Sequence, residues 1–544
     1  MKKALTIMLA LTMLIALAAC GSGNSAPTAT PGSTGGSINT PNPIGTDAPE
    51  GANPSEAVST DGKEYGGRLR IITTVDTSLS FGLPWTTATT NPLLVVPFAE
   101  ALCLESSYGE ILPCLATEWE TDPDNSQIRM KIREGVKFHD GSDLNAEVVE
   151  WNFKMAQDSG FLNRAILGVE ATGEYDITVH LDGYLNNALN ILATHAFAII
   201  SKENYDTNGA DYASEHPVGT GPFVFRERAH GINVVYEKNE NYWQEGKPYL
   251  DEVEYINITD NMTQNAAMLS DAADVLNTTL GEQIATLSAD SQLSVDLLPI
   301  GPAILAPSSV NEDSPLSKLE VRQAIAWAID REAICEARGF GILTPSNQYI
   351  GDGYMGRLPD DEVADYMGYD PEKARELLVQ AGYPDGFETT LIGGTSTDRD
   401  IAVALQSMLG DVGIVCELSF PEGALINEMT QNGWEGLLIS QARSMASITT
   451  TYRRFICPDY TYNVSVWRPS EEYRDLYVRS RTTPMMEDSL MRELSKLIMD
   501  YMLVIPMYDT YDAYVIRNNV HGTGFSQWGS GTLWLPQEAW ISTT

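Results

Sequence analysis

Residues 132–141 read Ile-Arg-Glu-Gly-Val-Lys-Phe-His-Asp-Gly, and residues 145–149 continue as Asn-Ala-Glu-Val-Val. The stretch follows a run of alternating polar and apolar residues, 127–133, which predicts a strand. Asp140 and Gly141 then favour a turn. A lone histidine such as His139 is more often a hydrogen-bonded structural residue than a ligand. These residues therefore predict a structural role rather than a catalytic or ligand-binding one.

Four further stretches of the same kind follow along the chain. Their glycines suit tight turns, and their aromatic residues are expected in the core. None of them is a catalytic constellation. They are Pro217-Val-Gly-Thr-Gly-Pro-Phe223; Asn239-Glu-Asn-Tyr-Trp243 with Gly246-Lys-Pro-Tyr-Leu-Asp-Glu252; Val321-Arg-Gln-Ala-Ile325 with Ala328-Ile-Asp-Arg331; and Tyr369-Asp-Pro-Glu-Lys-Ala374 with Ala381-Gly-Tyr-Pro-Asp-Gly386.

The five stretches, in this order, resemble the extracellular solute-binding proteins of family 5, which serve oligopeptide, dipeptide and nickel ABC transporters. The resemblance covers Tyr65 to Thr544. It implies an α/β, two-lobed periplasmic-binding-protein-like fold (type II, cluster C-like) with an inserted subdomain and a hinged ligand cleft. The implied parts are lobe I at 65–105, 215–310 and 511–544, an inserted subdomain at 106–214, and lobe II at 311–510.

Short periodic segments predict a mixed chain of helices and strands. A helix is expected from Pro371, with Asp370 as its cap and Gly382 closing it. Apolar stripes predict two more helices, at about 321–332 and 399–412. The predicted strands are 68–75, 127–133, 176–181, 234–238, 253–258 and 437–440.

The N-terminus has the features of an export signal. Lys2 and Lys3 precede an apolar run, and Leu17-Ala-Ala-Cys20 resembles a bacterial lipobox. That resemblance implies acylation of Cys20 and attachment to the extracytoplasmic face of the cell membrane; a plain signal peptide is the alternative. Residues 21–64 are rich in Gly, Ser, Thr and Pro, which predicts a disordered tether reaching roughly 40 Å.

The composition argues against several classes of function. The chain carries 34 Lys and Arg against 74 Asp and Glu, a net charge of -40. Such a balance disfavours nucleic acid as a partner. The six histidines are scattered, and phosphate-binding, dinucleotide-binding and hydrolase-serine motifs are absent. We therefore expect no metal, no cofactor, no catalytic residue and a binding protein rather than an enzyme.

The segment Trp434 to Met445 departs from the peptide-binding members of the resembled family. Those members carry a Gly-Trp-x-x-Asp-like segment whose carboxylate pairs with the peptide α-ammonium. Here the corresponding residues are Gln441-Ala-Arg-Ser444. If Arg443 faces the cleft, it favours an anionic group; the alternative is that it points to solvent or pairs with one of the many acidic residues. The chain is thus expected not to hold peptides by a free N-terminus, unless another carboxylate, such as Glu435 or Asp459, substitutes.

Trp85 lies where the resembled family often offers an aromatic side chain to the ligand, and core packing explains it equally well. Ligand contacts are therefore expected from Trp85, Gln441 and Arg443. Cys103 and Cys114 are close in sequence in an exported chain, which predicts a disulfide, with buried free thiols as the alternative.

The leading prediction is a monomeric, lipid-anchored receptor that passes a peptide-like or other small solute to the permease and ATPase subunits of an ABC importer. A solute or pheromone signalling receptor on the same fold is a second reading. An exported hydrolase without a recognisable motif is a third.

Overall fold

The computed structural model describes most of the chain beyond the N-terminal region. The described residues are 62–87, 92–107, 109–160, 166–394, 397–442, 452, 463–467, 471–483, 487–527 and 532–543. Cys20, nearly all of the predicted tether, Arg443 and Asp459 lie outside them. Among the described residues, no helix combines the length and apolarity needed to cross a membrane.

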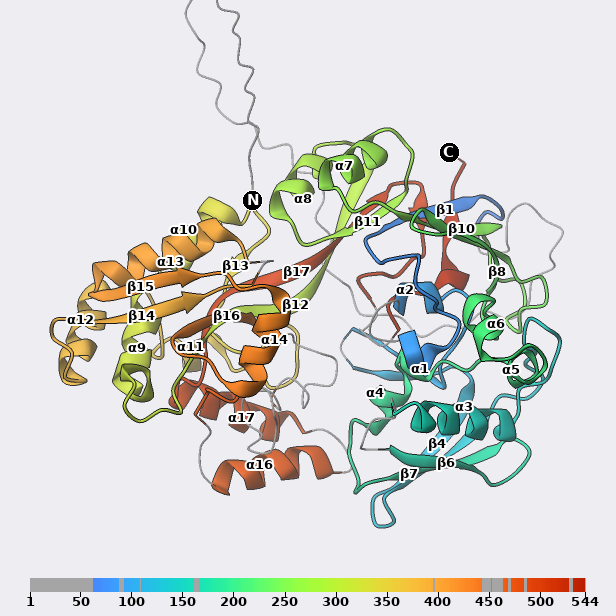
Figure 1. Cartoon of the computed structure of the whole chain (residues 1–544), viewed down its shortest axis with the longest axis horizontal. Helices are drawn as coiled ribbons and strands as arrows, with labels where there is room; N and C mark the ends of the chain where they lie inside the picture. The colour runs from blue at the N-terminus through green and yellow to red at the C-terminus, as the bar shows by residue number, and fades with distance from the viewer. Residues whose placement is uncertain are drawn as a thin grey trace, which may run out of the picture. The chain divides into compact units, whose positions relative to one another are not determined.

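An 11-stranded mixed sheet dominates the body, and Figure 1 shows its strands. Its strand order is β15-β14-β16-β12-β17-β11-β1-β10-β9-β8, with β13 paired to β17. All six predicted strands are confirmed, four in this sheet. The bounds are β1 Arg68–Thr73, β8 Phe223–Ala229, β9 Asn233–Lys238, β10 Glu252–Asn257, β11 Val275–Thr278, β12 Leu293–Pro307, β13 Thr344–Pro345, β14 Phe387–Ile392, β15 Ile414–Ser419, β16 Leu437–Gln441 and β17 Ile505–Arg517.

Two long antiparallel strands, β12 and β17, run through the middle of this sheet. At one end, Leu293 to Leu298 pair with β17 where β17 also pairs with β11. At the other end, Ala303 to Pro307 pair with β16. The register shifts between Pro299 and Gly301, and a bulge of this kind bends a strand. The pair therefore connects two halves of the sheet through an irregular segment.

A second sheet, of four strands in the order β4-β5-β7-β6, forms within the predicted inserted subdomain. It packs against α3 around its own apolar core, which includes Ile128, Val149 and Phe153. Asn145 caps α3 by accepting a hydrogen bond from Val148 N, and the family-like stretch 145–149 is thus a helix start. Its bounds and those of two minor sheets are β4 Ala116–Asp122, β5 Gln127–Ile132, β6 Ile166–Ala171, β7 Asp176–Leu181, β2 Cys103–Glu105, β3 Ile111–Pro113, β18 Val520–His521 and β19 Trp540–Ile541.

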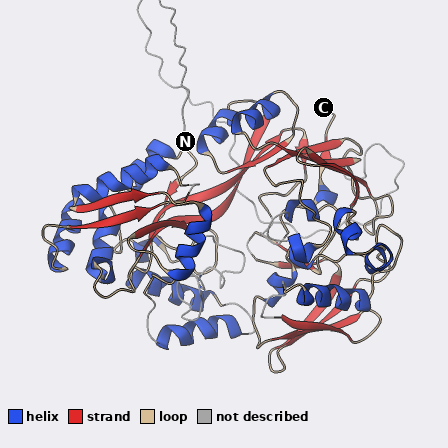
Figure 2. Cartoon of the chain, viewed as in Figure 1, coloured by secondary structure: helices blue, strands red, loops and turns tan. Residues whose placement is uncertain are grey.

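Helices lie around β14, β15 and β16 (Figure 2), which are parallel to one another. One apolar cluster contains residues of α9, α10, α12 and α13, and a separate cluster contains residues of α17. Burial on both faces is usual for parallel strands. The described helices are α1 Pro84–Thr87, α2 Pro92–Val95, α3 Ala146–Asp158, α4 Ala188–Leu192, α5 Lys202–Asn208, α6 Ala210–Glu215, α7 Asn261–Leu269, α8 Gly281–Ser288, α9 Leu319–Ala328, α10 Arg331–Arg338, α11 Asp360–Val363, α12 Pro371–Gln380, α13 Arg399–Asp411, α14 Gly423–Asn432, α16 Glu471–Thr482 and α17 Asp488–Asp500, with short 3-10 turns η1 His195–Phe197, η2 Pro315–Ser317 and η3 Pro536–Glu538.

The helices predicted from Pro371 and from Arg399 are confirmed, and Asp370 caps the first as expected. The single helix predicted at 321–332 is wrong, because the chain forms α9 and α10 instead. Ile329 is extended, and the Asp330 side chain accepts a hydrogen bond from Ala333 N to cap α10. A capping aspartate inside an apolar stripe thus ended one helix and began another.

Two buried arginines of the stretch 321–331 fasten these helices to the chain before and at the start of β17. Arg322 donates to the carbonyl oxygens of Leu316, Ser317, Tyr501 and Met502 at 2.6 to 3.3 Å. Arg331 donates to Pro506 O at 2.9 Å and to carbonyls near α9. Burial lowers the pKa of each to about 10. Both side chains thus have a structural role.

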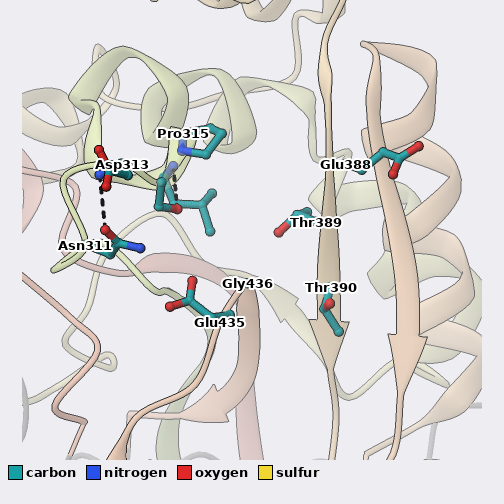
Figure 3. A pocket seen from close by; sticks show the side chains of 10 residues that line it. Asn311, Asp313, Pro315, Glu388, Thr389, Thr390, Glu435 and Gly436 are labelled. Atoms are coloured by element: carbon teal, nitrogen blue, oxygen red, sulfur yellow. Dashed lines mark hydrogen bonds between the residues drawn. The ribbon is translucent and has the colours of Figure 1, made fainter.

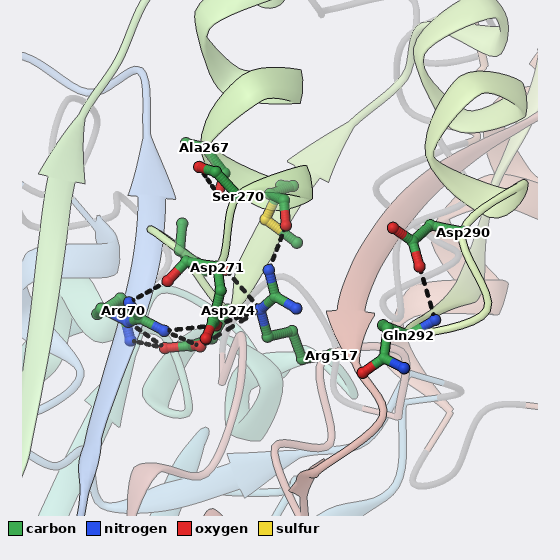
Figure 4. A network of polar contacts seen from close by, with 10 residues as sticks. Arg70, Ala267, Ser270, Asp271, Asp274, Asp290, Gln292 and Arg517 are labelled. Carbon is green, nitrogen blue, oxygen red and sulfur yellow. Dashed lines mark hydrogen bonds and ion pairs between the residues drawn. The ribbon is translucent and has the colours of Figure 1, made fainter.

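An ion-pair network fixes the far end of β17 to β1 and to the turn before β11 (Figure 4). Arg70 binds both oxygens of Asp274, at 2.7 and 2.9 Å. Arg517 lies 2.9 Å from Asp271 Oδ1 and donates to Ala273 O at 3.1 Å. The hydrogen bond to Asp274 contributes most to the raised pKa of Arg70.

Candidate functional site

Trp85, predicted as a ligand contact, lies in the core. Its exposed fraction is 5%, and its ring meets Trp151 edge-on, with 6.0 Å between the centroids. This burial agrees with core packing, the other explanation that the sequence allowed, and the ligand contact stays a prediction.

Gln441 lies at the end of β16 and is half-buried. Its Nε2 donates to Thr510 Oγ1 on β17, and Thr510 Oγ1 donates to Gly301 O at 2.7 Å. The intervening β12 carries Gly301, which has a φ of 100° and no side chain to block this contact. Gln441 thus links three strands at the irregular part of β12.

The disulfide predicted between Cys103 and Cys114 is not formed in the structure. Both residues are free, buried thiols: Cys103 begins β2, opposite Pro113 at the end of β3, and Cys114 directly follows β3. Burial raises the pKa of Cys103 to about 12 and that of Cys114 well above its ordinary value. Since the thiolate is the reactive form, both are protected from exchange.

A surface pocket of about 240 Å³ lies beside η2, β14 and the start of β16 (Figure 3). Its lining residues include Asp313, Glu388 and Glu435 and no basic side chain. Several of its polar groups serve the local backbone: Asn311 accepts from Asp313 N at 3.1 Å, and Ser314 from Leu316 N at 3.3 Å. Trp85, Gln441 and Arg443, the predicted ligand contacts, are not among its lining residues, whereas Glu435, the carboxylate named as a possible substitute, is.

Glu100 holds together two of the family-like stretches. Its carboxylate accepts hydrogen bonds from Tyr242 Oη at 2.6 Å, Trp243 Nε1 at 2.9 Å and Thr220 Oγ1 at 2.8 Å. Arg133 stacks on the Trp243 ring, 4.4 Å from its centroid. Burial raises the pKa of Glu100 against these contacts. Sequence reasoning missed this residue, because its partners are more than a hundred positions away.

His139 is a structural residue, as predicted. One ring nitrogen, Nε2, lies 2.9 Å from Gly221 O, and burial lowers the pKa of the ring to about 4. Gly219 and Gly221 pass so close to Phe98 that a Cβ at Gly219 would lie 2.1 Å from Phe98 O. The glycines therefore permit a close approach of two backbones, beyond the turn expected of them.

Asp509 is a buried acidic residue on β17, between β12 and β13. It pairs in register with Pro302 on β12 and Thr344 on β13, and its exposed fraction is 9%. Its Oδ1 has no hydrogen-bond partner among the described residues. Burial raises its pKa to about 6, although a hydrogen bond from Ser346 and the charge of Arg357 lower it.

Asn186, of the predicted inserted subdomain, contacts the C-terminal end of α16. Its backbone N donates to Arg481 O, and its Nδ2 to Ser480 O, each at 2.8 Å. The last carbonyls of a helix lack partners within the helix, so Asn186 caps α16 from a distant part of the chain.

In the described part of the chain, no group of three or more His, Cys, Asp or Glu could hold a metal ion.

Comparison with known proteins relates this arrangement to one family. The profile of the bacterial extracellular solute-binding proteins, family 5 Middle, matches residues 110–452. The glutathione-binding protein GsiB of Salmonella typhi is 31% identical over 315 residues, which are 56% of this chain and 60% of that protein. The match thus spans less than two thirds of this curated relative.

Solved structures share the fold. The periplasmic binding protein DppA from Helicobacter pylori, in complex with the peptide STSA, gives a TM-score of 0.71 at 20% identity, over 88% of this chain and 98% of that one. NikA from Brucella suis, in complex with Fe(III)-EDTA, gives 0.74 at 19% identity, over 88% and 100%. The chain therefore has the two-lobed fold of periplasmic binding proteins, as the sequence predicted.

Proposed function

Because the chain belongs to the bacterial extracellular solute-binding proteins of family 5, we propose that it captures a peptide-like or other small solute between two lobes. It then presents this solute to the permease of an ABC importer. The observation that carries the proposal is the family match over residues 110–452 on a fold whose two halves are connected by β12 and β17. Binding proteins on this fold lack transport machinery, so permease and ATPase subunits are the implied partners.

The lobes of this proposal follow the predicted boundaries. Lobe I comprises 65–105, 215–310 and 511–544 with the inserted subdomain 106–214, and lobe II comprises 311–510. The strand β12 ends three residues before the boundary at 310, and β17 crosses the boundary at 510. The register shift between Pro299 and Gly301 of β12 offers a place where the chain can bend. A solute shifts such a hinge only if it binds the closed form more tightly than the open form.

Asn186 supports a role for closure. Its contacts with Ser480 and Arg481 join the inserted subdomain to α16 of lobe II. We assign this contact to the closed form, in which the two lobes approach each other. This contact would therefore favour the closed form.

The finer features of the proposal come from the sequence. The protein acts as a monomer and not as an enzyme, acyl chains on Cys20 hold it at the extracytoplasmic face of the membrane, and Arg443 receives an anionic group of the solute. Gln441 lies two residues before Arg443, at the end of β16.

The function is tested by mass spectrometry of small molecules that copurify with the chain from residue 62 onward, followed by uptake of the identified solute in cells with and without the gene. A solute bound without turnover and imported only with the gene is the expected result. Hydrolysis of the solute, or uptake that does not depend on the gene, would contradict it.

A further inference from the structure

We propose that Asp509 receives the protonated amine of the bound solute, an assignment that rests on the proposed solute-binding function. The residue exposes only 9% of its surface, and its Oδ1 lacks a hydrogen-bond partner among the described residues. A buried acceptor without a partner is costly, so native structures rarely leave one unexplained.

The surrounding side chains do not neutralise this carboxylate directly. Arg357, whose charge lowers the pKa of Asp509, lies 3.5 Å from Asp352 Oδ1 and 3.5 Å from Asp360 Oδ1, and it donates to Ile350 O at 3.0 Å. No ion pair within 4 Å joins Asp509 to a basic residue of the described chain. The guanidinium therefore acts on Asp509 only from a distance.

The other described ionisable groups that interact with Asp509 add no positive charge. Asp352 acts on Asp509 as a like charge, while Tyr511 and Cys335 have their own pKa values raised by burial and by Asp509. With Arg357, these are the titratable groups among the described residues that interact electrostatically with Asp509. Above about pH 6 the site thus holds a buried anion with one open acceptor. A primary ammonium has three donors and no acceptor, and matches that need.

The position of Asp509 suits a solute held at the junction of the two lobes. Asp509 lies opposite Pro302, just after the register shift in β12. On the other side of this shift, Asp512 pairs with Leu298. The loop 346–357 lies against both strands, because Ser346 N donates to Met507 O at 3.1 Å and Tyr354 Oη to Pro299 O at 3.2 Å. Asp352 in this loop has 85% of its side chain exposed. The two interacting acidic side chains, Asp509 and Asp352, therefore extend from the protein interior to solvent.

Asp509 could replace the carboxylate that residues 441–444 lack in comparison with the peptide-binding members of the family. The carboxylate that peptide-binding relatives place after β16 is missing there. In the same sheet, β17 carries another carboxylate, Asp509, with β12 between it and β16. The sequence allowed such a substitution, although it pointed to Glu435 and Asp459. Glu435 instead accepts a hydrogen bond from Ser308 at 3.3 Å and lines the surface pocket.

Calorimetry with four probes tests the proposal: trialanine, N-acetyl-trialanine, spermidine and citrate. The wild-type chain should bind at least one of the two amine-bearing probes and should bind N-acetyl-trialanine at least about tenfold more weakly than trialanine, if trialanine binds. Asp509→Asn should weaken the amine-bearing probe about tenfold or more, while citrate is unaffected. The affinity of the wild type should rise between pH 5 and 7, as the carboxylate ionises.

Asp296→Asn is the matched control. Asp296 lies on β12, burial likewise raises its pKa, and Ser526 already supplies it with a hydrogen bond. This variant should bind the amine-bearing probe as the wild type does. Binding of the amine that is indifferent to Asp509→Asn, or no binding of either amine by the wild type, would overturn the assignment.

Two outcomes separate this assignment from the proposed function. If N-acetyl-trialanine or citrate binds and the amines do not, solute binding stands and the role of Asp509 falls. If a copurified solute lacks an amine, the same conclusion holds. Asp509→Asn should also leave the melting temperature of the unliganded protein at pH 7.5 unchanged or higher. Loss of binding with a lower melting temperature would mean a structural role and would overturn the assignment.

Discussion

Trp243 donates its indole N–H to Oε2 of Glu100 across 2.9 Å, and this bond joins a family-like stretch to the segment just before β2. Tyr242 and Thr220 complete the set of donors around the same carboxylate. Two of the five family-like stretches therefore meet at one acidic side chain, and Thr220, Tyr242 and Trp243 each supply it with a hydrogen-bond donor.

Glu100→Gln should lower the free energy of unfolding by about 2 to 4 kcal/mol, because an amide nitrogen would face donors that now have an acceptor. Urea unfolding followed by fluorescence measures the change. Glu417→Gln, on the exposed face of β15, should change it by less than about 0.5 kcal/mol. Equal effects of the two substitutions would show that the Glu100 contacts add little.

The unliganded wild type should lose stability relative to Asp509→Asn as the pH rises. The folded pKa of Asp509, about 6, lies above the ordinary value of 3.8, so its favourable contribution is complete below about pH 4 and is lost as the pH passes through 6. The difference should reach roughly 2 to 3 kcal/mol at pH 7.5, from about 1.4 kcal/mol per pKa unit. Urea unfolding of both proteins from pH 4 to 8 measures it; a difference that does not vary with pH would contradict the shift.

Arg322→Lys should destabilise the protein by about 2 to 4 kcal/mol, since three donors on a flexible chain cannot replace a guanidinium fork that serves four carbonyl groups. Thermal unfolding provides the comparison. Arg375→Lys, at an exposed pair with Glu372, is the control and should change stability by less than about 0.5 kcal/mol. A tolerated Arg322→Lys would mean that the carbonyls are satisfied in another way.

Asn186→Ala should weaken solute binding about fivefold if its contacts with α16 belong to the closed form, because the side-chain bond to Ser480 O, worth about 1 kcal/mol, is lost while the backbone bond to Arg481 O remains. Fluorescence transfer between labels on the two lobes should report a smaller closed population. Asn125→Ala, in the turn between β4 and β5, removes an amide from the same subdomain and should leave both measurements unchanged. Unaltered closure in Asn186→Ala would assign the contact to both forms.

Cys20→Ala should release the protein from the membrane or leave the precursor uncut, because the acyl chains would have no attachment site. Fractionation and immunoblotting of cells expressing each form measure this. Unchanged retention in the membrane fraction would exclude Cys20 as the anchor.

The sequence predicted what depends on neighbours in the chain. Alternation identified the strands at 68–75 and 176–181, and Asp370 with Pro371 identified the start of α12. It failed where a local signal competed with a longer pattern, as at Asp330, which ended a helix that its apolar stripe continued. It could not find Asp509, since the burial of that carboxylate depends on β12, β13 and the loop 346–357, which come together only in the fold.

Arg322 and Arg331 bind carbonyl oxygens of the main chain, which every amino acid presents alike. Their partners at positions 501, 502 and 506 can consequently change identity during evolution without loss of these bonds, provided that the backbone keeps its course. The two arginines thus constrain the path of the polypeptide that leads into β17 and leave its side chains free to diversify. A family that binds unlike solutes on one scaffold can be expected to retain such contacts while the residues around them vary.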